Sequence, residues 1–297
     1  MDIHGLVDYH LHTAVTIDAH ASEIAYCQRA VSLGLREIAF TNHIILGNPD
    51  YCMSPDNMNV HWQQIQICQQ RFPELIIRIG VEVDYFDGRE NDILSTIHAY
   101  EQLAGRPFDF ILGSVHYLKG ILFSSRSHAH ELFKSPETSS IGVDRKYCIS
   151  LYNEYFICAA RAVKSGIFNV MAHPDLIKKH TGELSPPVAF DAYQESVEGF
   201  IRALVDHDVG IEVNTRGLAM KVKELFPSDQ FLSHYISETR LRGVEPVITL
   251  GSDAHIADNL GAFLVDGVQA LQRAGCFMLT GFNRKKRYSI QLDHANN

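Results

Sequence analysis

Apolar residues along the chain follow two spacings, one typical of strands and one typical of helices. Short runs rich in β-branched and aromatic residues predict strands at residues 6–12, 38–43, 76–84, 108–117, 168–173, 210–214 and 246–253. Apolar residues at every third or fourth position predict helices at residues 22–33, 58–71, 91–103, 146–164, 189–206, 230–241 and 260–274. The stretches 44–57 and 119–145 are too long for ordinary connections, so we expect them to form lids or pocket walls.

The regular alternation of strands and helices predicts an α/β fold with a parallel sheet, because each helix carries the chain back to the start of the next strand. No linker or repeat divides the 297 residues, which favours one domain over residues 1–297. This number of strand and helix units in one domain favours a closed or nearly closed barrel. A doubly wound open sheet would show the same alternation and stays open as an alternative.

Composition and charge exclude several classes of protein. The chain is 46% hydrophobic and 21% charged, as in ordinary globular proteins, and lacks the roughly 20 consecutive apolar residues that a membrane span requires. Its net charge of −9 argues against a nucleic-acid partner, because such binding relies on clustered Lys and Arg. The basic run 284–287 is expected to be a solvated turn. Six cysteines without a CxxC pair favour a cytoplasmic location.

Histidine and acidic residues collect at the ends of the predicted strands. His10 and His12 point to the same face of the first strand, which is a natural way to offer two nitrogens to one metal ion. Later strands end on further side chains of the same kinds, namely His43, Glu82, His116, His173, Asp253 and, two residues on, His255. In a barrel these ends meet on one face, so we predict a metal centre there. Nine histidines elsewhere are expected to be solvated or capping residues: His4, His61, His98, His128, His130, His180, His207, His234 and His294.

Several short motifs occur in a consistent order: DYHLHT, TNH, GVEVDY, ILGSVHYL, AHPDLIKK, EVNTRGL and GSDAH, between residues 8 and 255. Together they resemble the PHP superfamily of metal-dependent phosphoesterases, and within it the histidinol-phosphate phosphatases. The resemblance implies a distorted (β/α)7 TIM-like barrel that holds three divalent metal ions, which are Zn, Mn or Fe. It also implies hydrolysis of L-histidinol phosphate, a small phosphorylated substrate, in histidine biosynthesis.

The resemblance also implies three sets of ligands, in which Glu82 serves two ions: His10, His12, Glu82 and Asp253 for the first ion, Glu82, His116 and His173 for the second, and Asp18, His43 and His255 for the third. A shared carboxylate reduces the repulsion between neighbouring cations, and mixed nitrogen and oxygen ligands suit these metals. Asn42 stands where relatives commonly carry an acid. If that acid orients a ligand, its loss weakens the third site by roughly 10 to 100-fold.

Such a centre predicts a phosphomonoesterase in which a hydroxide that bridges the first two metals attacks phosphorus. Arg216 is the first choice for holding the phosphate, because its planar group matches two phosphate oxygens, and Lys179 is the second choice. Asp253 or His255 is the catalytic residue that passes a proton to the leaving group, and the sequence does not choose between them.

Other functions stay open. The metal centre could serve another small phosphomonoester or a nucleotide, although a nucleotide or nucleic-acid enzyme should show a basic groove or stacking aromatic residues. A hydrolase of C–N bonds is disfavoured, because no predicted strand ends in Lys. A non-catalytic metal-binding module is disfavoured by the complete ligand set.

Overall fold

Parallel strands form the centre of the computed structural model, which describes residues 3–134 and 144–292. Three of them make one sheet, in the order β1 (Val7–Leu11), β2 (Glu37–Phe40) and β4 (Ile76–Ile79). Six make a second sheet, in the order β11 (Ile248–Gly251), β10 (Gly210–Asn214), β9 (Val170–Met171), β6 (Ile111–Ser114), β5 (Val81–Asp84) and β3 (His43–Ile44). All pairs within both sheets are parallel, which confirms the predicted α/β fold.

The two sheets share stretches of chain. Two of the predicted strands, 38–43 and 76–84, are each divided into a strand of the first sheet and a strand of the second, so that β2 leads into β3 and β4 leads into β5. Gly80 lies between β4 and β5, where a Cβ atom would come within 2.8 Å of the Phe110 ring. The two sheets also meet where β1 is the edge strand of the first and β11 is the edge strand of the second. There an isolated parallel bridge joins Leu11 of β1 to Ala254, just beyond β11.

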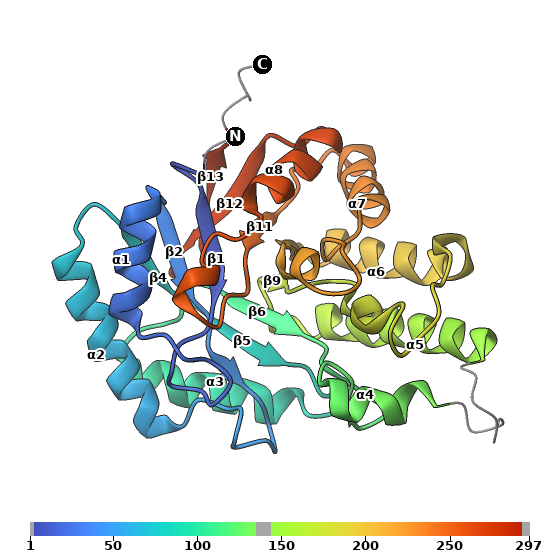
Figure 1. The fold of residues 1–297 in the computed structure, drawn as a ribbon, viewed down its shortest axis with the longest axis horizontal. Helices are drawn as coiled ribbons and strands as arrows, with labels where there is room; N and C mark the ends of the chain where they lie inside the picture. The colour runs from blue at the N-terminus through green and yellow to red at the C-terminus, as the bar shows by residue number, and fades with distance from the viewer. Residues whose placement is uncertain (1–2, 135–143, 293–297) are drawn as a thin grey trace.

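Helices surround the strands, with α1, α2 and α3 on one side and α5, α6 and α7 on the other (Figure 1). The α-helices are α1 (Glu23–Leu33), α2 (Pro55–Arg71), α3 (Glu90–Ala104), α4 (Arg126–Phe133), α5 (Arg145–Lys164), α6 (Gln194–Asp206), α7 (Asp229–Arg242) and α8 (Leu264–Arg273). Short 3₁₀ helices are η1 (Leu176–His180), η2 (Phe190–Ala192), η3 (Arg216–Ala219) and η4 (Ala257–Asn259). The predicted helices thus all exist, with ends shifted by a few residues. Among the described residues, none of these helices is long and apolar enough to cross a membrane.

The two long connections differ in structure. Residues 45–54 lack helix and strand, as expected for that loop. The stretch 119–145 is less irregular than predicted, because it contains part of an antiparallel hairpin, β7 (Tyr117–Leu118) with β8 (Ile121–Leu122), and all of α4. Residues 135–143 of this stretch lie outside the described part of the chain.

A C-terminal hairpin was not predicted from the sequence. β12 (Met278–Asn283) pairs with β13 (Lys286–Gln291). The predicted turn at 284–287 is shorter than expected, because Arg284 and Lys285 form the turn while Lys286 and Arg287 belong to β13. The hairpin is attached to the sheet through Glu37, whose Oε1 accepts hydrogen bonds from Tyr9, from Arg78 and from Tyr288 of β13. Glu37 is fully buried, so these donors replace the water that its Oε1 loses.

Candidate metal centre

The carboxyl ends of the strands converge on a cavity of about 290 Å³. His10 and His12 are fully buried beside it and do not line it. The cavity is lined by the seven other predicted ligands and both predicted phosphate-binding residues, together with residues of both long connections: Asp18, His43, Ile45, Asn48, Tyr51, Glu82, His116, Leu122, Ser124, Ser125, His173, Lys179, Arg216, Asp253 and His255. Both long connections therefore supply pocket walls, as expected.

Glu82 occupies the centre of the cluster, and its two oxygens face different histidines. Its Oε1 lies 2.9 Å from Nε2 of His173 and 3.6 Å from Nε2 of His116. Its Oε2 lies 3.2 Å from Nε2 of His10 and 3.4 Å from Nε2 of His12. Burial alone would raise the pKa of Glu82, but the surrounding histidines hold it well below its usual range. The carboxylate is therefore ionised and can serve two cations at once.

Asp253 lies on the side of the cluster nearest β1. Its Oδ1 is 3.4 Å from Nε2 of His12 and 4.0 Å from Nε2 of His10. Burial would raise the pKa of Asp253, but Arg216, whose Nη1 is 3.7 Å from the same oxygen, and His10 hold this pKa well below its usual range. Asp253 is therefore an anionic oxygen donor within reach of two imidazoles.

Asp18 joins the centre from the loop after β1. Its Oδ2 lies 3.4 Å from Nε2 of His43 and 3.4 Å from Nε2 of His255. The Nδ1 of His255 is 3.0 Å from the backbone oxygen of Asp253 and 2.8 Å from Nη1 of Arg216, and its Nε2 faces Asp18. The His12 ring lies between these two histidines, with ring centroids 4.3 Å from each. The structure thus brings all three predicted third-site residues together.

The residues fit divalent metal ions. Among the described residues, His12 Nε2 and Asp18 Oδ1 are buried without a hydrogen-bond partner, which is costly unless something else binds them. Four groups place their ligand atoms within 4.8 Å of one another: His12, His43 and His255; His10, His12 and Asp253; His10, Glu82 and His173; His43, Glu82 and His116. Three of these groups cross the boundaries of the implied ligand sets, because His12 also reaches the third set, His10 also reaches His173 and His43 also reaches Glu82.

Two buried acids behind the ligands were not singled out from the sequence. The Oε1 of Glu212 is 2.7 Å from Nδ1 of His10, and its Oε2 accepts the backbone N–H of His173 at 2.9 Å. Asp84 Oδ1 is 2.6 Å from Nδ1 of His116. Carboxylates in such positions fix which ring nitrogen faces the metal. The sequence could have indicated these two acids, because a carboxylate inside a predicted apolar strand is buried and must have a polar partner.

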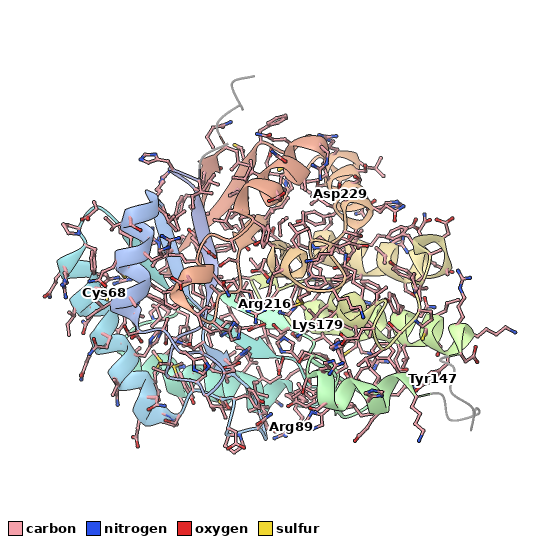
Figure 2. All side chains as sticks on the ribbon, in the orientation of Figure 1. Cys68, Arg89, Tyr147, Lys179, Arg216 and Asp229 are labelled. Atoms are coloured by element: carbon pink, nitrogen blue, oxygen red, sulfur yellow. The ribbon has the colours of Figure 1, made fainter. Side chains whose placement is uncertain are left out.

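The two predicted phosphate-binding residues line the same cavity, and Figure 2 labels them close together near the centre of the molecule. Nζ of Lys179 donates a hydrogen bond to the backbone oxygen of Ser124 at 2.7 Å, and burial, with the nearby Arg216, lowers the pKa of Lys179 to about 8. Nη1 of Arg216 donates to the backbone oxygen of Asp253 and lies 2.8 Å from Nδ1 of His255. About a third of the Arg216 side chain, 32%, is exposed, so a ligand can reach it.

Two histidines predicted to be solvated are buried instead. His61 of α2 is 1% exposed and His180 of η1 is 4% exposed. Each has a partner that replaces water, since Nδ1 of His61 is 2.5 Å from Oε1 of Glu23 and Nε2 of His180 is 2.9 Å from the backbone oxygen of Phe123. A single histidine within a helical pattern does not reveal such partners, because they come from distant parts of the chain.

The fold and the site together define a class of α/β proteins that gather histidines and acids at the carboxyl ends of parallel strands. Residues 8–216 match the PHP domain, and the chain belongs to this family. The resemblance seen in the sequence motifs is thereby confirmed. Asp253 and His255 follow the matched segment, and the geometry described above brings them to the same cavity.

Proteins similar to this chain are known over nearly its whole length. A protein named probable histidinol-phosphatase from Deinococcus radiodurans is 27% identical over 285 residues, which are 95% of this chain and 98% of the relative. A histidinol-phosphatase from Lactococcus lactis is 26% identical, over 94% of this chain and 95% of the relative. A solved structure of histidinol phosphate phosphatase from Lactococcus lactis, complexed with Zn, L-histidinol and phosphate, has a TM-score of 0.78 and 24% identity, over 96% of this chain and 99% of that chain.

Proposed function

We propose that this protein is a metal-dependent phosphoric monoester hydrolase that converts L-histidinol phosphate into L-histidinol and phosphate. The observation that carries the proposal is the placement of Glu82, whose oxygens face separate groups of histidines in a cavity that Arg216 and Lys179 also line. Anion-binding side chains beside a site for several cations suit a phosphate group. The names of relatives that span almost the whole chain support L-histidinol phosphate as the substrate.

Three divalent ions are proposed, either Zn, Mn or Fe, and the zinc in the similar Lactococcus lactis structure supports zinc. When bound, such ions lower the pKa of water and neutralise charge on a phosphoryl group. The proposed ligands are His10, His12, Glu82 and Asp253 for the first ion, Glu82, His116 and His173 for the second, and Asp18, His43 and His255 for the third.

The cations of the chain bind and orient the phosphate in this proposal. Arg216 offers the unoccupied donors of its guanidinium to two phosphate oxygens, while its Nη1 remains on the backbone oxygen of Asp253. Lys179 supplies a second positive charge to the cavity, fixed by its hydrogen bond to the backbone oxygen of Ser124. Asp253 or His255 passes the proton to the leaving oxygen, and both line the cavity.

The proposed architecture is a distorted seven-stranded barrel in one domain. The division of β2 from β3 and of β4 from β5 leaves seven strand positions around the cavity, and the bridge between Leu11 and Ala254 supports closure between β1 and β11. A continuous buried core that includes residues from Val7 to Leu292 supports a single domain.

A comparison of substrates tests the function. The purified protein, with Zn, Mn or Fe added, should release phosphate from histidinol phosphate faster than from nucleoside monophosphates or a nucleoside bisphosphate, and should leave a short oligonucleotide intact. The Glu82→Gln variant controls for contaminating phosphatases. A preference for a nucleotide would overturn the substrate and retain the phosphoesterase, whereas no release from any phosphomonoester would overturn the enzyme class.

A further inference from the structure

A buried polar cluster lies outside the proposed ligand sets and consists of Thr13, Glu23, Asn42 and His61. We propose that these four residues, the Asn42 cluster, are positioning residues that hold the loop of residues 14–21 so that Asp18 reaches His43 and His255. The cluster would thereby set the affinity of the third metal site. This inference rests on the proposed metal centre and adds to it residues that do not touch a metal.

The direction of each hydrogen bond in the cluster follows from one backbone group. The N–H of Thr13 can only donate, so the atom 2.7 Å from it is the oxygen of the Asn42 side chain. The amide nitrogen of Asn42 then faces Nε2 of His61 at 3.2 Å, and this nitrogen must accept. The ring proton of His61 is therefore on Nδ1, which donates to Oε1 of Glu23. The cluster has one consistent arrangement of protons.

The cluster ties both ends of the loop together. Thr13 lies two residues beyond the end of β1 and Glu23 begins α1, and the hydroxyl of Thr13 is 3.4 Å from Oε1 of Glu23. Within the loop, the backbone N–H of Ala14 donates to the oxygen of Ala21 at 2.9 Å. At the tip of the loop, Ile17, next to Asp18, is 61% exposed, whereas Ala19 is buried and the backbone N–H of His20 donates to the oxygen of His255 at 2.9 Å. Polar contacts at the base of the loop act together with these contacts to place Asp18.

The negative charge of the cluster lies on Glu23. Burial alone would raise the pKa of Glu23, but the hydrogen bond from His61 holds it below its usual range, so Glu23 is ionised. Thr13 contacts Glu23 directly, whereas the amide of Asn42, which precedes His43 in the sequence, is neutral. Asn42 thus takes the place of an acid beside the third site without adding a negative charge there. The acid that holds the arrangement is Glu23, at the start of α1.

The contacts also join α1 to α2, which lie side by side in Figure 1, so a purely structural role is the alternative. Zinc affinity separates the two roles. We would titrate zinc into the chelator-treated full chain against a competing chelator, for the parent, His61→Phe and Glu23→Leu, and record a thermal melt of each. Ile65→Val is the matched control, because Ile65 lies one helical turn from His61, is fully buried and is apolar.

Positioning by the cluster predicts that His61→Phe and Glu23→Leu weaken the most weakly held zinc by about 10 to 100-fold and leave the other zinc ions close to parental affinity. Ile65→Val should lower the melting temperature without changing any zinc affinity. Glu23→Gln keeps an oxygen that accepts the His61 proton, so it should retain most of the affinity that Glu23→Leu loses. Nitrogen-15 NMR of the zinc-loaded parent should find the His61 proton on Nδ1.

Several results would overturn the inference. Parental zinc affinity in both His61→Phe and Glu23→Leu would remove the positioning role and leave the metal centre intact. An equal loss in Ile65→Val would assign the effect to general loosening of α2, and a His61 proton on Nε2 would contradict the derived arrangement even if a variant fails to fold. A parent that binds no zinc, manganese or iron would instead remove the proposed function, and the inference with it.

Discussion

Replacing Glu212 by Gln tests whether the carboxylate behind His10 controls metal binding. Oε2 of Glu212 accepts two donors, the backbone N–H of His173 at 2.9 Å and Nδ2 of Asn214 at 3.1 Å. In the variant, the glutamine oxygen must stay on that side, because an NH₂ group would face two donors. The NH₂ group then faces Nδ1 of His10, which lies 2.7 Å from Oε1 in the parent. His10 must accept there and carry its proton on Nε2, the atom needed for the metal.

The expected cost of Glu212→Gln is a 10 to 100-fold loss of zinc affinity at the first site, or about 1.4 to 2.7 kcal/mol. Competition with a chelator measures this loss, and excess zinc should restore much of the phosphatase activity. Glu198→Gln on the exposed surface of α6 is the matched control. Parental zinc affinity in Glu212→Gln, with the His10 proton still on Nδ1 by nitrogen-15 NMR, would refute the reasoning.

Four further predictions concern other parts of the molecule. Glu82→Gln should lose more metal than any single histidine variant, because its oxygens face two groups of histidines; metal analysis that finds equal, mild losses would place the bridge elsewhere. Arg216→Lys should lower kcat/KM by roughly 10 to 150-fold at unchanged metal content, since one charge-assisted pair is worth about 1.5 to 3 kcal/mol, and a change within about twofold would remove the clamp. Lys179 carries its charge below its pKa of about 8, so KM should rise as pH increases through that value, and Lys179→Arg should move this rise to higher pH in initial-rate assays. Tyr288→Phe removes one donor to buried Glu37 and should lower the free energy of unfolding by about 0.5 to 1.5 kcal/mol in urea melts, and no change would mean that the hairpin is held by other contacts.

The ligand side chains could be predicted from the sequence because strand geometry is simple. Side chains two apart on a strand share a face, which placed His10 with His12, and the ends of parallel strands meet, which placed Glu82 near His116 and His173. Asp18 could be predicted as a ligand only from the family resemblance, because it lies in a loop whose path depends on contacts with residues far along the chain.

The C-terminal hairpin was missed for a physical reason. Its turn places Arg284 and Lys285 at φ of 49° and 64°, in the left-handed region that Asn and Gly usually occupy. A basic pair carries no such hairpin signal, so the sequence suggested a solvated turn without the paired strands on either side of it. The turn is stabilised from outside, since both backbone N–H groups donate to Asp109, at 2.9 Å to its side chain and 2.8 Å to its backbone oxygen. Such a partner cannot be read from local sequence.

Partners from distant parts of the chain also hold the backbone of the metal ligands, so the buried acids behind the ligands are as important for the site as the ligands themselves. His173 and Asp253 have φ of 30° and 53°, a conformation that costs side-chain-bearing residues of order 1 to 3 kcal/mol and persists only where neighbours hold it. Glu212 accepts the backbone N–H of His173, and Asp8 accepts that of Ser252, just before Asp253, at 2.8 Å. Each acid comes from a neighbouring strand, so strand register fixes both the strained backbone and the ligand that it carries. Since these contacts stabilise the turns as well as the ring orientation, variants of Glu212 and Asp8 should lose stability and metal together, whereas Arg216→Lys, which keeps a positive charge beside Asp253, should keep its metal.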